Sequence, residues 1–177
     1  NIRDFIFQNN GATGSATGVT MSARGNVNRC TVASVRGYGM YSNSSTTFSE
    51  CEAYDFNQSN TANLAGFFCC TAIRCIAHDG NQHGFRAPSN TYGNLWVGCI
   101  AHVCTKYGFY AAGLRTCAAY QCDAYNNTDT GFYIDSTGGV VENCNAVGNG
   151  GYGIHLGARH VCNNNGFGSG TEANTSG

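Results

Sequence analysis

The chain has 177 residues, of which 11% are charged, and its formal net charge is −1 at pH 7. This balance argues against binding to nucleic acid or a membrane surface through charge. The chain has no run of about 18 apolar residues, so no membrane span is predicted. With 25 glycines, one proline and 42% hydrophobic residues, the composition indicates a single domain with many turns.

A Cys-x-Ala tripeptide recurs along the chain at intervals of 18 to 24 residues between its cysteines. Cys30 opens a looser copy and Cys162 a degenerate one. A Gly-aromatic or Gly-aliphatic pair follows most copies nine residues after the cysteine, and an insertion in loop 58–64 delays it in one copy. Counting residues 5–7 with Gly18 as an earlier copy predicts about seven repeats. The five clear copies begin at Cys51, Cys75, Cys99, Cys122 and Cys144.

Apolar residues within a repeat alternate with a period of two, and turn residues separate three short apolar patches. This pattern predicts an all-β fold, a right-handed single-stranded parallel β-helix (a solenoid) of about seven coils of 18–25 residues, with three short strands per coil. A β-sandwich would need hairpin signals and no fixed period. We place the β-helix at 1–165 and a Gly-rich tail or linker at 166–177, and we expect a fragment of a longer protein.

Equivalent residues of successive coils lie ~4.8 Å apart in a parallel sheet and form columns through the solenoid. Three columns are predicted to face inward: the repeat cysteines, the alanines two residues later, and the residue after each repeat glycine. The cysteine column is Cys30, Cys51, Cys75, Cys99, Cys122, Cys144 and Cys162, and the third column is Met40, Phe67, Phe85, Phe109, Phe132 and Ile154.

The recurring pattern Cys/Asn-x-Ala-x-x-Asn-x-x-x-Gly-Phe/Ile, as in Cys144-Asn145-Ala146 and Gly153-Ile154, resembles the right-handed β-helix repeats of the pectate-lyase-like superfamily. That superfamily includes polysaccharide lyases, glycoside hydrolases, uronate epimerases and phage tailspikes, and its enzymes hold polysaccharide along a strand face. The resemblance covers nearly the whole chain. It rests on core and turn residues, so it implies the fold and not a particular activity.

The 11 cysteines raise the alternatives of disulfides and of a metal site. Cysteines in register on parallel strands keep their Cβ atoms near the ~4.8 Å strand spacing, beyond the ~3.8 Å mean of a disulfide. We therefore predict a buried ladder of free thiols. Spacings of five residues between cysteines follow from the repeat and exceed those of zinc sites, so we expect no metal and no cofactor. The cysteines outside the ladder, which could pair, are Cys69, Cys70, Cys104 and Cys117.

Two outward-facing stripes are predicted, because the inward columns are committed to the core. The first is the candidate binding surface, whereas cross-strand aromatic stacking alone can explain the second. Exposed rings one coil apart can stack on one another or on the flat faces of sugars. Three interpretations of the first stripe stay open: contact with a glycan, an interface with another chain, or stacking without a partner. The first stripe is Tyr41, Phe68, Arg86, Tyr110, Tyr133 and His155, and the secondary stripe is Tyr54, His78, His102 and Tyr125.

The most plausible cluster for catalysis lies on the first stripe and offers a base, a cation and hydroxyl groups. It consists of His83, Arg86, Tyr107, Tyr110 and Tyr133. Carboxylates are sparse, and no coil carries the close acidic group that a glycoside hydrolase of this superfamily uses. This scarcity makes an enzyme the less favoured hypothesis.

These patterns favour a structural or binding β-helical rod of a fibre, spike or adhesin, extracellular or virion-associated, that contacts carbohydrate or a neighbouring chain. The alternative is a polysaccharide-degrading or -modifying enzyme, such as a lyase, a glycoside hydrolase or an epimerase. Terminal coils expose pairing edges, and no capping helix is evident at Phe5 or after Cys162. We therefore expect self-association, as a trimer or an end-to-end fibre.

Overall fold

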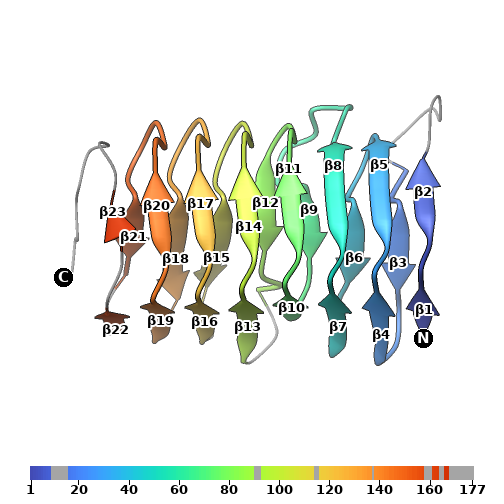
Figure 1. Cartoon of the computed structure of the whole chain (residues 1–177), viewed down its shortest axis with the longest axis horizontal. Coiled ribbons are helices and arrows are strands. Elements are labelled where there is room, and N and C mark those ends of the chain that lie inside the picture. The colour runs from blue at the N-terminus through green and yellow to red at the C-terminus, as the bar shows by residue number, and fades with distance from the viewer. Residues whose placement is uncertain are drawn as a thin grey trace.

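The computed structural model describes residues 1–8, 16–89, 93–113, 116–136, 138–157, 161–163 and 166–167. This part of the chain contains 23 β-strands and no helix, and each turn of the solenoid contributes one strand to each of three parallel sheets (Figure 1). The sheets have eight, eight and seven strands, so the number of turns agrees with the predicted seven to within one. The predicted all-β parallel β-helix is confirmed.

Each sheet takes every third strand of the chain. Sheet A consists of β1 (Ile2–Arg3), β4 (Gly25–Asn28), β7 (Thr46–Ser49), β10 (Thr71–Ile73), β13 (Asn94–Val97), β16 (Cys117–Tyr120), β19 (Gly139–Glu142) and β22 (Val161–Asn163). Sheet B consists of β2 (Ile6–Gln8), β5 (Thr31–Val35), β8 (Glu52–Phe56), β11 (Ile76–His78), β14 (Ile100–His102), β17 (Asp123–Tyr125), β20 (Asn145–Val147) and β23 (Gly166–Phe167). Sheet C consists of β3 (Val19–Met21), β6 (Met40–Ser42), β9 (Ala65–Phe68), β12 (His83–Arg86), β15 (Phe109–Gly113), β18 (Phe132–Ser136) and β21 (Ile154–Leu156).

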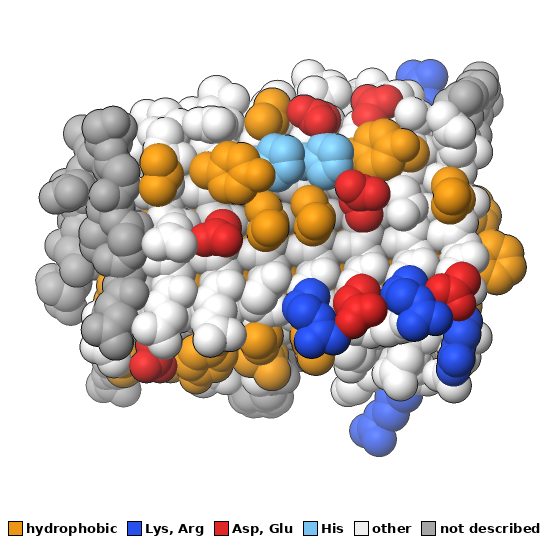
Figure 2. Space-filling view, in the orientation of Figure 1, with side chains coloured by type: hydrophobic (Ala, Val, Ile, Leu, Met, Phe, Trp, Pro, Cys, Tyr) orange, Lys and Arg blue, Asp and Glu red, His pale blue; other side chains and the backbone are white. Residues whose placement is uncertain are grey.

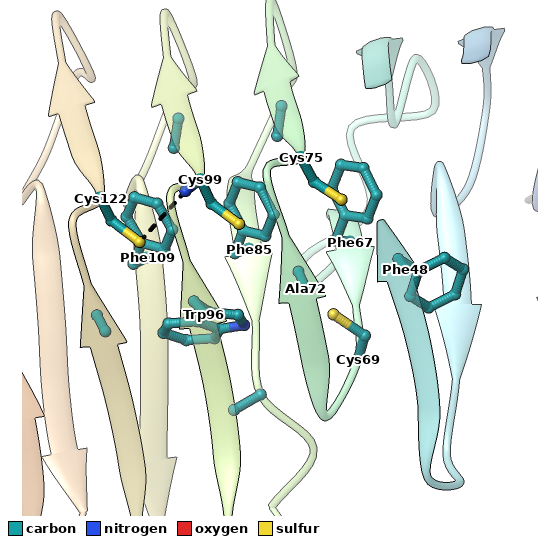
Figure 3. Packing of buried hydrophobic residues seen from close by; sticks show 14 of the residues in the cluster. Phe48, Phe67, Cys69, Ala72, Cys75, Phe85, Trp96, Cys99, Phe109 and Cys122 are labelled. Carbon is teal, nitrogen blue, oxygen red and sulfur yellow. Dashed lines mark hydrogen bonds between the residues drawn. The ribbon is translucent and has the colours of Figure 1, made fainter. Parts of the chain in front are cut away.

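The inward columns form the core, and the third of them is a stack of rings. Phe85 lies between Phe67 and Phe109 with ring centroids 4.9 and 4.8 Å apart, and Phe132 follows Phe109 at 4.6 Å. All four side chains are fully buried. Figure 3 shows Phe67, Phe85 and Phe109 of this stack in the interior together with the buried cysteines that precede the sheet B strands. The predicted third column is therefore confirmed as core.

The thiol ladder also lies inside the solenoid. None of the 11 cysteines forms a disulfide, including the four that could have paired, and ten of them are buried. The Sγ of Cys122 accepts a hydrogen bond from the Cys99 amide at 3.4 Å and donates one to the Tyr120 carbonyl at 3.3 Å. Burial raises the pKa of the Cys99 and Cys122 thiols, so they stay protonated and unreactive.

The assignment of Cys162 to the ladder was wrong. Cys162 pairs with Val141 in sheet A, and residue 166, not residue 163, pairs with Asn145 in sheet B. The interval of 18 residues after Cys144 is too short for a complete coil, so Cys162 reaches only the sheet A strand. Sheet B thus extends two residues into the segment predicted as a tail, while residues 168–177 lie outside the described residues.

The alanine and the glycine of the repeat recur together because they are the two sides of one close contact. A Cβ atom on Gly108 would lie 2.8 Å from the carbonyl oxygen of Gly131 in the next coil and 3.1 Å from the Cβ of Ala124 on sheet B. Gly84 meets Gly108 and Ala101 in the same way, at 2.7 and 2.8 Å. Any larger side chain would push sheets B and C apart.

Two columns of residues with positive φ, with values from 50° to 67°, turn the chain just before the sheet B strands of the cysteine repeats and at or just after their ends. Side chains other than those of Gly, Asn and Asp rarely adopt this conformation. The first column precedes each repeat cysteine and the second follows it by four residues. The first is Arg29, Glu50, Arg74, Gly98, Gln121 and Asn143, and the second is Ser34, Asp55, Asp79, Val103, Asn126 and Gly148.

A ladder of buried asparagines supports the turn from sheet B to sheet C. The side-chain oxygen of Asn127 accepts from the Cys104 amide, and that of Asn149 accepts from the Asn127 amide, both at 3.1 Å. The side-chain amides donate to the carbonyls of Ala101 and Ala124 at 3.1 and 2.9 Å. The ladder satisfies backbone groups that the turn would otherwise leave buried without partners.

Candidate functional site

The first predicted stripe runs along the outer face of sheet C as a continuous stack. Tyr41 stacks on Phe68 with ring centroids 5.0 Å apart and an interplanar angle of 8°. Arg86 occupies the next coil, where its guanidinium carbon lies 5.3 Å from the Phe68 centroid and 5.9 Å from that of Tyr110. Both distances are within the range of a cation–π contact. The arginine therefore continues the stripe.

The stack continues through Tyr133 to His155. The ring of Tyr133 lies 5.6 Å from that of Tyr110 and 4.5 Å from that of His155. The structure thus brings all six residues of the first stripe together on one face. Their role in binding stays a prediction.

A second column, formed by the residue before each repeat glycine, lies beside the first stripe and carries a ring in four of its six coils. Tyr38 packs 5.0 Å from Tyr41, and Tyr152 packs 5.8 Å from His155. The candidate residues His83 and Tyr107 belong to this column, but Tyr38 and Tyr152 were missed. The signal that could have found them is their constant position before the glycine. The column is Tyr38, Ala65, His83, Tyr107, Thr130 and Tyr152.

The predicted catalytic cluster lies where the two columns meet. The His83 ring stacks on Tyr110 at 4.6 Å and on Tyr107 at 5.3 Å, and Tyr107 stacks on Tyr133 at 4.9 Å. His83 is fully buried, and neither ring nitrogen has a hydrogen-bond partner among the described residues. Burial, with the nearby charge of Lys106, lowers the pKa of His83 to about 3. The imidazole is therefore neutral at neutral pH.

Two tyrosine hydroxyls of the cluster, those of Tyr107 and Tyr133, are also held in their neutral form. Burial, followed by the negative charge of Asp129, raises the pKa of Tyr107 to about 12. Burial and Asp135 raise the pKa of Tyr133. These phenols can donate hydrogen bonds, but they are poorly suited to remove a proton near pH 7.

Two cationic side chains, Arg86 and Lys106, lie at the centre of the outer face of sheet C. The guanidinium of Arg86 donates a hydrogen bond to the Asn63 carbonyl, and the Lys106 Nζ lies 5.3 Å from the Tyr107 ring centroid. Among the described residues, no group of three or more His, Cys, Asp and Glu side chains has the geometry to hold a metal ion. The site as built presents ring edges, can donate hydrogen bonds and can attract an anion.

The secondary stripe forms a single stack on the outer face of sheet B, where two histidines lie between aromatic rings (Figure 2). Successive centroids from Tyr54 through His78 and His102 to Tyr125 are 5.2, 4.9 and 4.7 Å apart. The two ring nitrogens of His78 contact carboxylates, Asp79 at 2.7 Å and Glu52 at 3.2 Å. Unlike the sheet C surface, this stack is one ring wide and acidic at its sides.

Residues 17–175 match the family described as the right-handed β-helix region. The chain belongs to this family. The match supports the right-handed coiling predicted from the repeats, and the pectate-lyase-like resemblance is confirmed at the level of fold. In the part of the chain that the structure describes, no helix is long and apolar enough to cross a membrane.

Two solved structures are similar to this β-helix. The A-module of the mannuronan C-5 epimerase AlgE4 of Azotobacter vinelandii aligns with a TM-score of 0.63 and 18% identity, over 79% of this chain and 41% of the module. The periplasmic alginate epimerase AlgG aligns with a TM-score of 0.49 and 15% identity, over 92% of this chain and 40% of that one. No curated protein matches in sequence. The chain spans about two fifths of the length of both structures. The likeness to the AlgE4 module establishes the fold alone.

Proposed function

We propose that this chain binds an extended polysaccharide along the outer face of sheet C. The observation that carries the proposal is the unbroken stack from Tyr41 to His155, widened by Tyr38, Tyr107 and Tyr152. Coils follow one another at ~4.8 Å, close to the length of one sugar residue in an extended chain. Because the rings cover one another's faces, a polymer along the stripe would contact ring edges, while the phenol hydroxyls would bond to the hydroxyls of successive sugars.

The two cations at the middle of this face favour an acidic polymer there, whereas Asp129 and Asp135 make the neighbouring coil less favourable to it. Arg86 and Lys106 lie at the middle of the stack, and a guanidinium pairs well with a carboxylate in a planar, two-point contact. The similar A-module is named for an activity on mannuronan, which supports a polysaccharide as the class of ligand. The proposal implies an extracellular or periplasmic location, where such polymers occur.

The test is to measure binding of the purified chain to alginate, polygalacturonate and a neutral glucan by calorimetric titration and by affinity electrophoresis. Tyr110→Ala is expected to weaken binding to the acidic polymers at least tenfold, and Arg86→Gln is expected to reduce the dependence of binding on salt. Tyr54→Ala, which removes a ring from sheet B, is the matched control. Equal binding by wild type and Tyr110→Ala would contradict the proposal.

A second candidate function is chemical modification of the bound polymer at the cluster of His83, Arg86, Tyr107, Tyr110 and Tyr133. Arg86 and Lys106 favour it, because lyases and epimerases of uronates must neutralise a carboxylate. The neutral imidazole and the high pKa of Tyr107 argue against it, because neither group is tuned for proton transfer near pH 7. Release of unsaturated or reducing ends, or solvent deuterium entering the sugar, would support it if Tyr107→Phe abolished the signal.

The fibre hypothesis depends on self-association. Three large apolar side chains of the first coil, Phe5, Ile6 and Phe7, are 59%, 78% and 46% exposed, which would suit contact with another coil. Light scattering and negative-stain electron microscopy test this point. Trimers or filaments that disappear in a Phe5→Ser/Ile6→Ser variant would support the rod, and a monomer at all concentrations would argue against it.

A further inference from the structure

The ring stack on sheet B ends at Tyr125, and one face of that ring is less covered than the other. His102 covers one face at a centroid distance of 4.7 Å. The residue in register on the next strand is Val147, which is smaller than a ring and is 46% exposed. No further ring contact of Tyr125 occurs among the described residues. The stack therefore ends with an aromatic face turned toward a small aliphatic side chain.

A hollow of about 370 Å³ lies at this end of the stack. Its size is at the lower end of the range of small-molecule sites, ~300–1,000 Å³. The step arises at Val147, which stands where the four preceding coils carry rings. The neighbouring Gly148 leaves room for the Asn126 side chain, whose Oδ1 lies 2.5 Å from where a Gly148 Cβ would be. The lining is Asp123, Ala124, Tyr125, Asn126, Asn145 and Val147.

The polar groups of the hollow form a complementary set. The Asn145 side-chain amide donates to the Asp123 carboxylate at 2.7 Å, which fixes both groups on one side of the Tyr125 ring. Asn126 is exposed on the adjoining turn. A carboxylate accepts from hydroxyl groups, and amides both donate and accept. Figure 2 shows this part of the face with an acidic side chain beside the aromatic row and no Lys or Arg.

We propose that this hollow, which we call the Tyr125 site, binds a neutral sugar residue. The flat C–H face of a pyranose would stack on the uncovered face of Tyr125 and contact Val147. Two neighbouring sugar hydroxyls would donate to Asp123 and accept from the amides of Asn145 and Asn126. The inference does not depend on the function proposed for sheet C, which lies on another face and uses cations.

The charge of the site selects against acidic sugars. Asp123 lines the hollow, Glu52 and Asp79 flank the same ring stack, and no Lys or Arg lines the hollow. A ligand carboxylate would meet this negative charge without a partner. The two faces of the solenoid therefore differ in preference, with acidic polymer expected on sheet C and neutral sugar on sheet B.

The test uses saturation-transfer NMR and calorimetry with the methyl glycosides of glucose, galactose, mannose and N-acetylglucosamine, and with methyl glucuronide as the charged comparison. At least one neutral glycoside is expected to bind with a millimolar dissociation constant, and the glucuronide at least fivefold more weakly. Tyr125→Ala and Asp123→Ala are each expected to weaken binding at least tenfold. Tyr125→Phe, which keeps the ring, should retain it.

Val147→Tyr is the sharpest variant, because it continues the ring stack by one coil and covers the free face of Tyr125 without removing any polar group. It is expected to fold normally, as shown by circular dichroism, and to lose binding of the neutral glycoside. Tyr54→Ala at the other end of the stack and Tyr110→Ala on sheet C should bind as wild type does.

Three results would overturn the inference: no saturable binding of any neutral glycoside, binding that persists in folded Val147→Tyr, or binding lost in Tyr110→Ala. The last result would show that the neutral sugar binds on sheet C. Failure of the polymer titration with retained binding at the Tyr125 site would instead contradict only the function proposed for sheet C.

Discussion

Sheet C carries a stack of rings on each of its two faces, one inside the solenoid and one on its surface. The inner rings, from Phe67 to Phe132, lie 4.6–4.9 Å apart with interplanar angles of 3–7°. The outer stack from Tyr41 to His155 has similar spacings, 4.5–5.6 Å where two rings meet. Because the parallel backbone sets both spacings, stacking alone does not indicate a function.

The two stacks differ in burial and in composition. The inner column is fully buried and almost uniform, since every coil must fill the same space. The outer stack includes an arginine and a histidine, and it is joined by a second column with Tyr107 and a buried imidazole, His83. Variation on the outside of a uniform repeat is therefore the signal that points to a binding site.

The largest expected effect is a difference in the free energy of unfolding between variants of two neighbouring residues that lie on opposite faces of sheet C. Phe109→Ala removes a fully buried ring from the inner stack and is expected to lower the free energy of unfolding by ~3–5 kcal/mol. Tyr110→Ala removes the next side chain, which faces outward, and is expected to cost about 1 kcal/mol or less. Urea unfolding of both variants makes the measurement. Similar losses would show that the outer stack also serves mainly to stabilise the fold.

His83 offers a second way to test the comparison of the inner and outer stacks of sheet C. It belongs to the column beside the outer stack, but its side chain is fully buried and can titrate. The unfolded chain binds a proton at His83 below about pH 6.5, whereas the folded chain does so only near pH 3. The free energy of unfolding is therefore expected to fall between these values as the pH drops, by up to ~1.4 kcal/mol per pH unit.

The measurement is urea unfolding between pH 7 and pH 3.5 for wild type and for two variants. His83→Gln is expected to lose most of this slope, and His155→Gln, at the end of the outer stack, is expected to keep the part that comes from His83. An unchanged slope in His83→Gln would show that other groups cause the loss of stability in acid.

Asparagines inside and outside the solenoid should differ as the inner and outer rings do, with the larger loss of stability when the buried side chain is removed. Asn127→Ala removes the acceptor of the buried Cys104 amide and one partner of Asn149, and it is expected to cost ~1–3 kcal/mol. Asn145→Ala, an exposed residue of sheet B, is expected to change stability by no more than about 0.5 kcal/mol. Chemical unfolding of the two variants tests the difference, and equal effects would mean that water replaces the ladder.

Most of the fold could be predicted from the sequence because one repeat is one coil. The positions of Cys99, Ala101 and Phe109 in their repeat already place them inside, since the period determines the column and the alternation determines the face. The prediction failed at Cys162, where the repeat shortens and the register shifts to sheet A. A column is predictable only as long as the coil length is maintained.

The candidate site could be predicted only in part. The first stripe follows from the position after each Gly-aromatic pair, but Tyr38 and Tyr152 lie before the glycine, where the strand begins and the alternation is not yet established. The neutral state of His83 depends on burial by neighbouring coils, which no linear pattern shows. The hollow beside Tyr125 depends on the volumes of side chains brought together from two coils.

The smallest expected effect concerns two valines that are equally exposed, at 46% each, but differ in backbone conformation. Val103 has φ +52° in the turn after sheet B, where a β-branched residue is strained, whereas Val147 lies in strand β20. Val103→Gly is expected to raise the free energy of unfolding by about 0.5–1 kcal/mol, and Val147→Gly to lower it by about 1 kcal/mol. Thermal and urea unfolding give the signs. A loss of stability in both variants would show that packing of the Val103 side chain outweighs the strain of its backbone.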